Sequence, residues 1–245
     1  AAFNDYLIIK DKWVIDMVLA TVVGNSFLDR DPIWTMLVAP SSGGKTSILA
    51  PCISLDNVTF VDDVTEKSFL SGYKAGGKDP SLLKKIGSNG IMAFSDFTSI
   101  LAKDPGSRGE ILTQFKLIYD GSLSKHTGTG GAKWTGKIGF IGAATPDVYT
   151  MLEGARSLGE RFAYYWVDQP TDSEIIAKQR SVFISSKEIT TLMSALYKEY
   201  IFDVCEFKDR YGLPEFSMTE DQRARIRQAA MFCVNGKATV HTNFK

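Results

Sequence analysis

The chain has 245 residues, of which 44% are hydrophobic, and its 28 Lys and Arg residues are balanced by 28 Asp and Glu residues. This length can bury a sizeable core, and it favours one α/β domain with a smaller appendage. The formal net charge of zero gives no overall attraction to nucleic acid or to a membrane surface, so any contact with nucleic acid must be local.

The cysteines and the lengths of the apolar runs indicate the cellular compartment of the protein. The three cysteines, Cys52, Cys205 and Cys233, are widely spaced without a metal-type pairing, which favours a reducing compartment and core positions. No apolar run reaches the ~18 residues of a membrane span, and the amino terminus lacks a cationic signal sequence. We therefore expect a cytoplasmic protein without a membrane segment.

Hydrophobic periodicity predicts the elements in chain order. Apolar residues at helical spacing from Lys10 to about Phe27 predict a helix, which Asp31-Pro32 ends before the first strand. Short apolar runs predict strands at 33–38, 58–61, 91–94, 138–143 and 162–167. Strands separated by helical stretches indicate a mainly parallel sheet covered on both faces, with ligand chemistry at the strands' carboxyl ends.

The same pattern divides the chain. Residues 1–170 are predicted to form the α/β core with its N-terminal helix, and residues 171–245 a smaller, lid-like helical region. The Gly- and Lys-rich stretch 71–80 is predicted to be a loop. In the helical region, residues 219–222 resemble a capping box ahead of a helix that carries three arginines, Arg223, Arg225 and Arg227.

The segment after the first strand is the most informative one. Residues 39–47 read Ala-Pro-Ser-Ser-Gly-Gly-Lys-Thr-Ser and match the pattern G-x-x-x-x-G-K-[ST] except that Ala39 replaces the first glycine. In such a loop, backbone N–H groups surround phosphate oxygens, the lysine reaches the outer phosphates and the threonine hydroxyl binds Mg²⁺. The predicted ATP-binding residues are Ser41, Ser42, Gly43, Gly44, Lys45, Thr46 and Ser47.

Two further points attach to this loop. If the position of Ala39 needs a positive φ, its side chain would strain the backbone there by about 1 kcal/mol. The alternative interpretation of the whole segment is an ordinary Gly/Ser turn with a surface lysine. The strand before it, the helix after it and the intact Gly44-Lys45-Thr46 favour the phosphate loop.

A phosphate loop needs an acid on a neighbouring strand to orient the metal and the attacking water. Asp96, after the strand at 91–94, is the candidate, and two alignments with an Asp-Glu pair stay open. Either Asp96 serves Mg²⁺ together with Thr46 and Phe97 stands in the slot of the water-activating Glu, or Ser95 takes the metal side and Asp96 is the base. In the first case the reserve bases are Asp62, Asp63 and Glu66. Asp96 as a simple helix cap is the third interpretation.

A basic stretch lies between the third and fourth predicted strands. Residues 121–137 contain several glycines and no acid, with Lys125, His126, Lys133, Trp134 and Lys137 among them. Lysine and imidazole donors can bind a sugar-phosphate backbone while an aromatic ring stacks on a base. The alternative is a solvated loop with Trp134 packed back onto the domain.

Two more residues lie at strand ends. Thr145 follows the fourth predicted strand, where a side chain can meet the γ-phosphate or the attacking water; capping of the next helix is the alternative. Arg161 precedes the fifth strand and can reach a neighbouring subunit's nucleotide as a trans-acting finger, with a local ion pair as the alternative.

Taken in order, these pieces resemble the AAA+ superfamily, and within it the helicase branch of MCM-like and superfamily 3 viral helicases. Lys125-His126 is similar to the DNA-tracking tip of the viral hairpin, Ala-Ala-Thr-Pro at 143–146 to the MCM Ala-Ala-Asn-Pro sensor, and Glu-Arg-Phe at 160–162 to its Ser-Arg-Phe finger. The sequences at residues 96–98, 119–121 and 158–162 also resemble those of uncharacterised ATPases of phages and integrative elements. The resemblance covers roughly residues 31–167.

The resemblance implies a P-loop ATPase fold and a ring-forming, Mg-ATP-dependent motor that acts on single- or double-stranded DNA in replication or mobilisation of a mobile element. Thr145 would then be the sensor, Arg161 the finger, and Lys125, His126 and Lys133 the DNA contacts. A nucleotide-gated interaction module that binds ATP without translocating is the alternative, and a small-molecule kinase is a third. No sensor arginine can be fixed in the C-terminal helices.

Overall fold

The computed structural model describes residues 8–11, 13–27, 31–41, 43–71, 80–127, 130–152, 158, 161–171, 173–176, 185–212 and 219–225, with the backbone alone at 126–127 and 130. The chain forms two compact units, residues 1–204 and 205–245. The predicted loop at 71–80 lies largely outside the described residues, as does Cys233.

The first unit is built on a five-stranded sheet of strand order β2-β3-β6-β1-β7. Every neighbouring pair in it is parallel. The strands are β1 (Trp34–Val38), β2 (Val58–Phe60), β3 (Ile91–Phe94), β6 (Gly139–Ala144) and β7 (Phe162–Trp166). The α/β class, the parallel sheet and all five predicted strands are confirmed, each strand to within one residue at either end.

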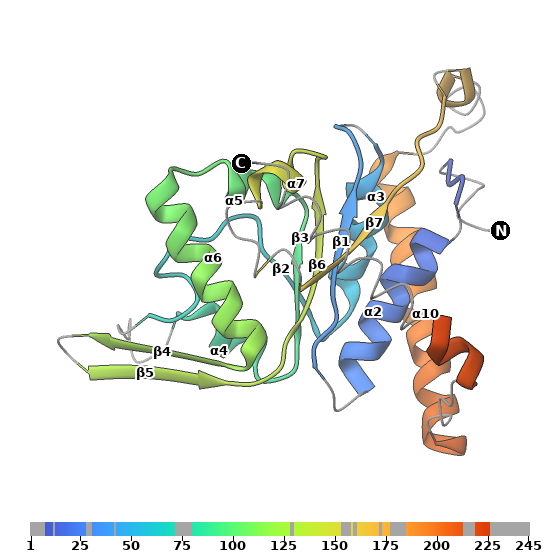
Figure 1. Ribbon diagram of the computed structural model, residues 1–245. Coiled ribbons are helices and arrows are strands. Elements are labelled where there is room, and N and C mark those ends of the chain that lie inside the picture. Colours follow the sequence, from blue (N-terminus) through green and yellow to red (C-terminus); the bar gives the residue numbers. More distant parts are fainter. Residues whose placement is uncertain are drawn as a thin grey trace. The chain divides into compact units, whose positions relative to one another are not determined.

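Helices cover both faces of this sheet (Figure 1). One face carries α2 (Trp13–Phe27), α3 (Lys45–Leu49), the 3-10 turn η1 (Ala50–Ser54) and the first part of α10 (Ser186–Tyr211). The other carries α4 (Leu82–Ile86), α5 (Thr98–Leu101), α6 (Pro105–Asp120) and α7 (Val148–Met151).

Side-chain alternation along β1 explains the two layers. Trp34, Met36 and Val38 pack into the cluster under α6, whereas Leu37 packs with α2 and α3 on the opposite face. All five residues of β1 are buried, as expected for a central strand with helices on both sides. The strand that carries the Gly-Lys-Thr loop is therefore held from both faces.

The predicted N-terminal helix is confirmed as α2, and Asn25 fixes where β1 begins. Its side-chain amide donates to the carbonyl of Ile33 (2.9 Å) and accepts from the amide of Ile33 (2.9 Å). Gly139, at the start of β6, packs so closely on this side chain that an added Cβ would lie 2.3 Å from the Asn25 amide carbon. The amino ends of β1 and β6 are thus aligned through α2.

Aromatic rings fill the core under α6. Phe115 lies edge-on to Phe97 and Phe140, with ring centroids 5.5 and 5.9 Å away, and Trp34 packs against Phe140 at 5.3 Å. Trp34 also donates its indole N–H to the carbonyl of Ile138 (2.9 Å), which satisfies its polar atom. These contacts fix α6 across the sheet.

No strand follows β7 in the described part of the chain, where residues 173–176, α10 and residues 220–225 are helical. In the first unit, Tyr197 of α10 is buried and donates its hydroxyl to the carbonyl of Ile48 (3.0 Å). In the second unit, Thr219 and Gln222 form the predicted reciprocal capping box, with bonds of 2.9 and 3.2 Å. Arg225 pairs with Asp221 (2.9 Å), and Arg227 lies outside the described residues.

Cys52 is buried as predicted, and burial raises the pKa of its thiol to about 12. Cys205 is only partly buried. None of the helices in the described ranges combines the length and apolarity needed to cross a bilayer.

Candidate functional site

The candidate site lies where the parallel strands end. Because β1, β3 and β6 are parallel neighbours through β6, their following segments open on the same edge of the sheet (Figure 1). The amide of Ala39 donates to the carbonyl of Ala144 (3.2 Å), and the amide of Phe97 donates to the carbonyl of Ala143 (2.7 Å). The Gly-Lys-Thr loop, Asp96 and Thr145 are therefore brought to one edge, which we call the carboxyl edge.

The backbone of residues 39–41 and 43–48 leads from β1 into α3. The Gly43 amide donates to the Pro40 carbonyl (3.1 Å), and Gly44 adopts a left-handed conformation with φ of 72°. The first helical bond runs from the Ile48 amide to the Gly44 carbonyl (3.2 Å), so the amides of residues 44–47 precede it and have no intrahelical acceptor. Such amides at a helix start are available for anion oxygens.

Ala39 does not take the left-handed position of the loop. Its amide extends the β1–β6 ladder by one bond, and the residue is fully buried. The positive φ falls on Gly44, a residue without Cβ. Ala in place of the first pattern glycine is thus compatible with the loop found here.

Lys45 lies against its own loop. Its ammonium donates to the carbonyls of Ala39 (2.7 Å) and Pro40 (2.8 Å). Desolvation by burial lowers the pKa of Lys45, and the charge of Asp96 partly opposes this effect. Lys45 and Asp96 therefore interact electrostatically at the carboxyl edge.

The other predicted loop residues are accessible. Ser41, Gly44 and Thr46 are exposed, and Gly43 and Ser47 are half-buried; Ser42 lies outside the described residues. No group of three or more His, Cys, Asp or Glu side chains that could hold a metal occurs in the described residues. The donors present fit Mg²⁺ in the way that nucleotide sites do, with few protein ligands and the rest supplied by phosphate and water.

Gln169 is a contact that sequence reasoning missed. It follows β7, and its side-chain amide donates to the carbonyl of Val167 (2.7 Å) and lies 3.5 Å from the carbonyl of Gly43. A Cβ added at Gly43 would lie 2.6 Å from the Gln169 Oε1 atom and 2.9 Å from the Ala39 Cβ atom. A side chain at position 43 would therefore require Gln169 and Ala39 to shift, and nothing local in the sequence signals a contact across 126 residues.

At Asp96 the structure bears on the open alignments. Phe97 is fully buried among core aromatic rings, so a water-activating group does not come from that slot. Asp96 is exposed, and its Oδ1 atom accepts from the amide of Thr98 (2.9 Å) at the start of α5, although the N-cap residue of this helix is Phe97, one residue after the position that the capping interpretation gave. The charge of Asp96 also acts on Lys45, so its position is compatible both with binding Mg²⁺ and with acting as the base.

The reserve acids differ in their surroundings. Asp63 pairs with Lys103 (2.8 Å), and Asp62 is exposed beyond β2 at the outer strand of the sheet. Glu66 contributes its backbone carbonyl, which accepts from Gln114 (3.0 Å) and from Lys125.

Thr145 sits beside α5. Its amide donates to the hydroxyl of Thr98 (2.8 Å), and its own hydroxyl donates to Asp147 Oδ2 (3.1 Å). This threonine follows β6, the strand between β1 and β3, so it lies between the loop and the Asp96 segment. The predicted position of a sensor side chain at the carboxyl edge is therefore reproduced by the fold, while its role stays a prediction.

Arg161 lies at the opposite, amino edge of the sheet, because it precedes β7. Its guanidinium pairs with Asp120 at the end of α6 (2.8 Å) and stacks over the Tyr119 ring at 5.1 Å. The alternative of a local ion pair is thus observed, with Asp120 as the partner; Glu160 lies outside the described residues. A finger role in trans would require this pair to open.

The basic stretch forms an antiparallel hairpin, β4 (Ser122–Thr127) with β5 (Gly130–Thr135), which extends from the amino edge (Figure 1). The Lys125 ammonium donates to the Glu66 carbonyl, and desolvation by burial lowers its pKa, opposed by Glu110 and Glu66. Lys133 is exposed, and the side chain of His126 lies outside the described residues.

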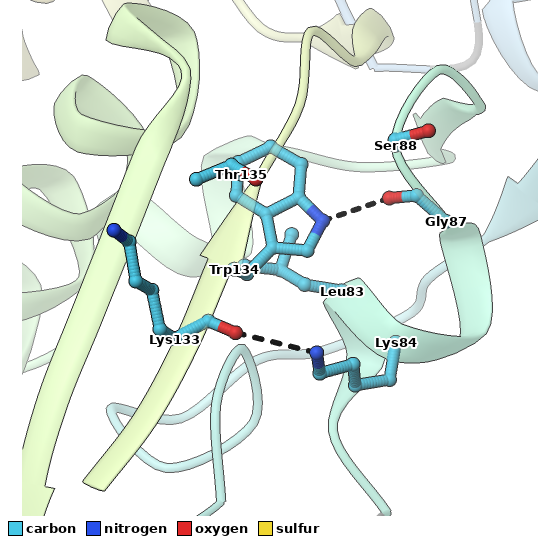
Figure 2. Close-up of a pocket in the computed structure, with 7 residues that line it drawn as sticks. All are labelled: Leu83, Lys84, Gly87, Ser88, Lys133, Trp134 and Thr135. Carbon is cyan, nitrogen blue, oxygen red and sulfur yellow. Dashed lines mark hydrogen bonds between the residues drawn. The ribbon is translucent and has the colours of Figure 1, made fainter.

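The Trp134 ring is buried and is not available for base stacking, so that expectation was wrong and the alternative of a ring packed back onto the domain is found. Its side chain is only 4% exposed, and its indole N–H donates to the Gly87 carbonyl (2.8 Å). It forms one wall of a hollow of about 250 Å³ between α4 and β5 (Figure 2). Lys84 of α4, on the other side of the hollow, donates to the Lys133 carbonyl (3.2 Å), while the Lys133 side chain extends away from Lys84 (Figure 2).

The chain matches no protein-family profile, and no curated protein matches it. Function is therefore inferred from the chemistry of the carboxyl edge.

The contact between Gly43 and Gln169 gives a stability test. Gly43→Ala should lower the free energy of unfolding by about 1–3 kcal/mol, because the new methyl group overlaps Gln169 and Ala39. Adding Gln169→Ala should recover part of this loss, measured by urea denaturation. Gly109→Ala on the exposed face of α6 is the control and should be neutral or stabilising, since its Cβ would meet no atom within 4 Å. Equal losses at positions 43 and 109 would contradict the packing argument.

Proposed function

We propose that this chain is an Mg-ATP-dependent P-loop ATPase of the AAA+ type that its sequence resembles, acting on DNA as a ring of subunits in replication or mobilisation of a phage or mobile element. The observation that carries the proposal is the loop at residues 39–47, with amides ahead of the first helical bond and a lysine beside it. A helix start of this kind suits a polyphosphate.

The arrangement of charges supports a nucleotide over a simple anion. Lys45 would exchange its two carbonyl acceptors for phosphate oxygens, which bind an ammonium more strongly than neutral acceptors do. Thr46, exposed in the first turn of α3, would offer its hydroxyl to Mg²⁺, and Asp96 would hold Mg²⁺ through water. The metal would neutralise charge on the phosphates during transfer.

The proposed partners lie at the other end of the sheet. Arg161 precedes Phe162, which pairs with Trp34 at the start of β1, so it lies at the edge opposite its own phosphate loop, which favours action on a neighbouring subunit. The hairpin, which carries exposed Lys133 close to exposed Lys84, provides a local basic surface on a chain without net charge. Lys125 and His126 remain proposed DNA contacts.

A second candidate function is favoured by one observation. Phe97 is buried in the core at the position where a water-activating Glu would follow Asp96. A chain without that carboxylate can bind ATP and assemble with a partner while hydrolysing it slowly. This is the nucleotide-gated module, and it shares the loop chemistry with the first proposal.

Lys45→Ala should weaken ATP binding by at least tenfold, because the loop loses its only cation on the phosphates and keeps its amides. The measurement is titration with a fluorescent ATP analogue and Mg²⁺, followed by phosphate release with and without single-stranded DNA. Lys116→Ala, an exposed lysine on α6, is the matched control. Wild-type chain that leaves ATP unbound contradicts the proposal, whereas tight binding without hydrolysis in every oligomeric state selects the nucleotide-gated module.

Arg161→Ala should abolish DNA-stimulated turnover while ATP binding to the subunit persists. If the finger acts in trans, mixing Arg161→Ala with Lys45→Ala subunits should restore part of the activity. An interface between one intact loop and one intact arginine forms only in the mixture. Phosphate release across mixing ratios is the measurement, and Asp120→Asn controls for loss of the ion pair alone. Mixtures that stay inactive would show that the arginine does not act between subunits.

Replacement of Lys133 on the hairpin or of Lys84 on α4 should change the salt dependence of DNA binding. Lys133→Ala and Lys84→Ala should each lower the slope of log Kobs against log salt by roughly 0.7 on single-stranded DNA, because each removes about one phosphate contact. Fluorescence anisotropy at several salt concentrations gives this slope. The Lys116→Ala variant should keep the wild-type value, and unchanged slopes for both Lys133→Ala and Lys84→Ala would rule out this surface.

A further inference from the structure

Three polar residues form a chain of hydrogen bonds beside the phosphate loop. Thr98 begins α5, Thr145 follows β6, and Asp147 precedes α7, and these two short helices contact each other at the carboxyl edge (Figure 1). Thr145 is the residue after Ala144, whose carbonyl accepts from the Ala39 amide of the loop. The chain therefore starts one residue away from the phosphate-loop backbone.

The direction of the Thr145 hydroxyl bond is fixed by its acceptor. Its oxygen lies 3.1 Å from Asp147 Oδ2, and an ionised carboxylate can only accept. The single hydroxyl proton of Thr145 is thus committed to Asp147. The Thr145 oxygen also lies 3.4 Å from the Thr98 hydroxyl oxygen and accepts there, so what it offers to a ligand at this edge is its remaining lone pair.

The Asp147 side chain does not cap the helix that it precedes. Asp147 is the N-cap residue of α7, where an aspartate side chain usually accepts a hydrogen bond from an amide of the first turn. Here its carboxylate makes no capping bond, and one oxygen accepts from Thr145 instead. Its side chain is exposed, so the carboxylate is in contact with solvent as well.

Resting on the proposed ATP hydrolysis, we propose that Thr145 accepts a hydrogen bond from the attacking water and that Asp147 orients Thr145 and receives the proton. The water oxygen bonds to the γ-phosphorus as the bond from that phosphorus to the β,γ-bridging oxygen breaks, with its electron pair leaving on ADP. The water proton passes to the Thr145 oxygen and the Thr145 proton to Asp147. Asp147 thereby supplies the carboxylate that the buried Phe97 cannot.

A γ-phosphate sensor would need the opposite polarity. To report the γ-phosphate, the Thr145 hydroxyl must donate its proton to a phosphate oxygen, which requires release from Asp147. The two roles therefore make different predictions for binding. A sensor contributes to the affinity for ATP over ADP, whereas a water-orienting pair contributes to the rate alone.

The test compares four variants, Thr145→Val, Thr145→Ser, Asp147→Asn and the double variant Thr145→Val/Asp147→Asn. Single-turnover hydrolysis at saturating Mg-ATP should fall at least tenfold in Thr145→Val and in Asp147→Asn, and the double variant should be no slower than the slower single one, because the residues act as a unit. Thr145→Ser keeps the hydroxyl and should retain the rate to within a few fold. The ratio of ADP to ATP dissociation constants should stay unchanged in all four.

Asp56→Asn, an exposed carboxylate outside the site, is the control for removal of one charge. A lower ratio of ADP to ATP dissociation constants in Thr145→Val would overturn the inference in favour of the sensor. So would a normal rate in Asp147→Asn, or loss of hydrolysis in Asp62→Asn instead. Tight ATP binding by wild-type chain without turnover also overturns it, whereas failure to bind ATP at all refutes the proposed function itself.

Discussion

The pairing of β1 with β6 is the constraint on which the rest of the structure depends. Its last hydrogen bond, from Ala39 to Ala144, joins the start of the Gly-Lys-Thr loop to the residue before Thr145. Because the strands are parallel, both segments leave the sheet on one edge, and β3 on the far side of β6 brings Asp96 to the same place. Burial of β1 on both faces keeps this register, since a slip of one residue would exchange Met36 and Leu37 between two differently packed cores.

Much of this fold could be predicted from local patterns in the sequence. Apolar runs bounded by Gly, Pro and Asp marked every strand of the sheet, and Thr219 with Gln222 formed the predicted capping box. The order of the strands could not be predicted, because placing β6 between β1 and β3 depends on contacts between distant segments. Trp134 shows the same limit: its ring is buried because a carbonyl 47 residues away accepts its indole proton. Gln169 against Gly43 likewise has no signal in either segment alone.

The loop that follows β1 makes contacts with distant parts of the chain. The ladder bond of Ala39 and the close contact of Gly43 with Gln169 fix two points of this backbone, and Gly44 adopts the left-handed conformation that starts α3. Only the Lys45 side chain would need to turn to meet a phosphate, leaving two neutral carbonyl acceptors. A loop that orders few groups on binding loses little conformational entropy, so more of the interaction energy appears as affinity.

The Gly-Lys-Thr loop and Asp96 lie at the carboxyl edge of the sheet, whereas Arg161 and the hairpin lie at the amino edge. The helix α6 spans the distance between these two edges. The helix starts at an Asp104 cap just after α5 and ends at Asp120, which pairs with Arg161; the hairpin follows at once. Its 16 residues make it about 24 Å long. Phe115 packs it against Phe97, the neighbour of Asp96. The contact between Phe115 and Phe97 therefore ties the Asp96 segment to the same helix that ends at Asp120, the partner of Arg161, and leads into the hairpin.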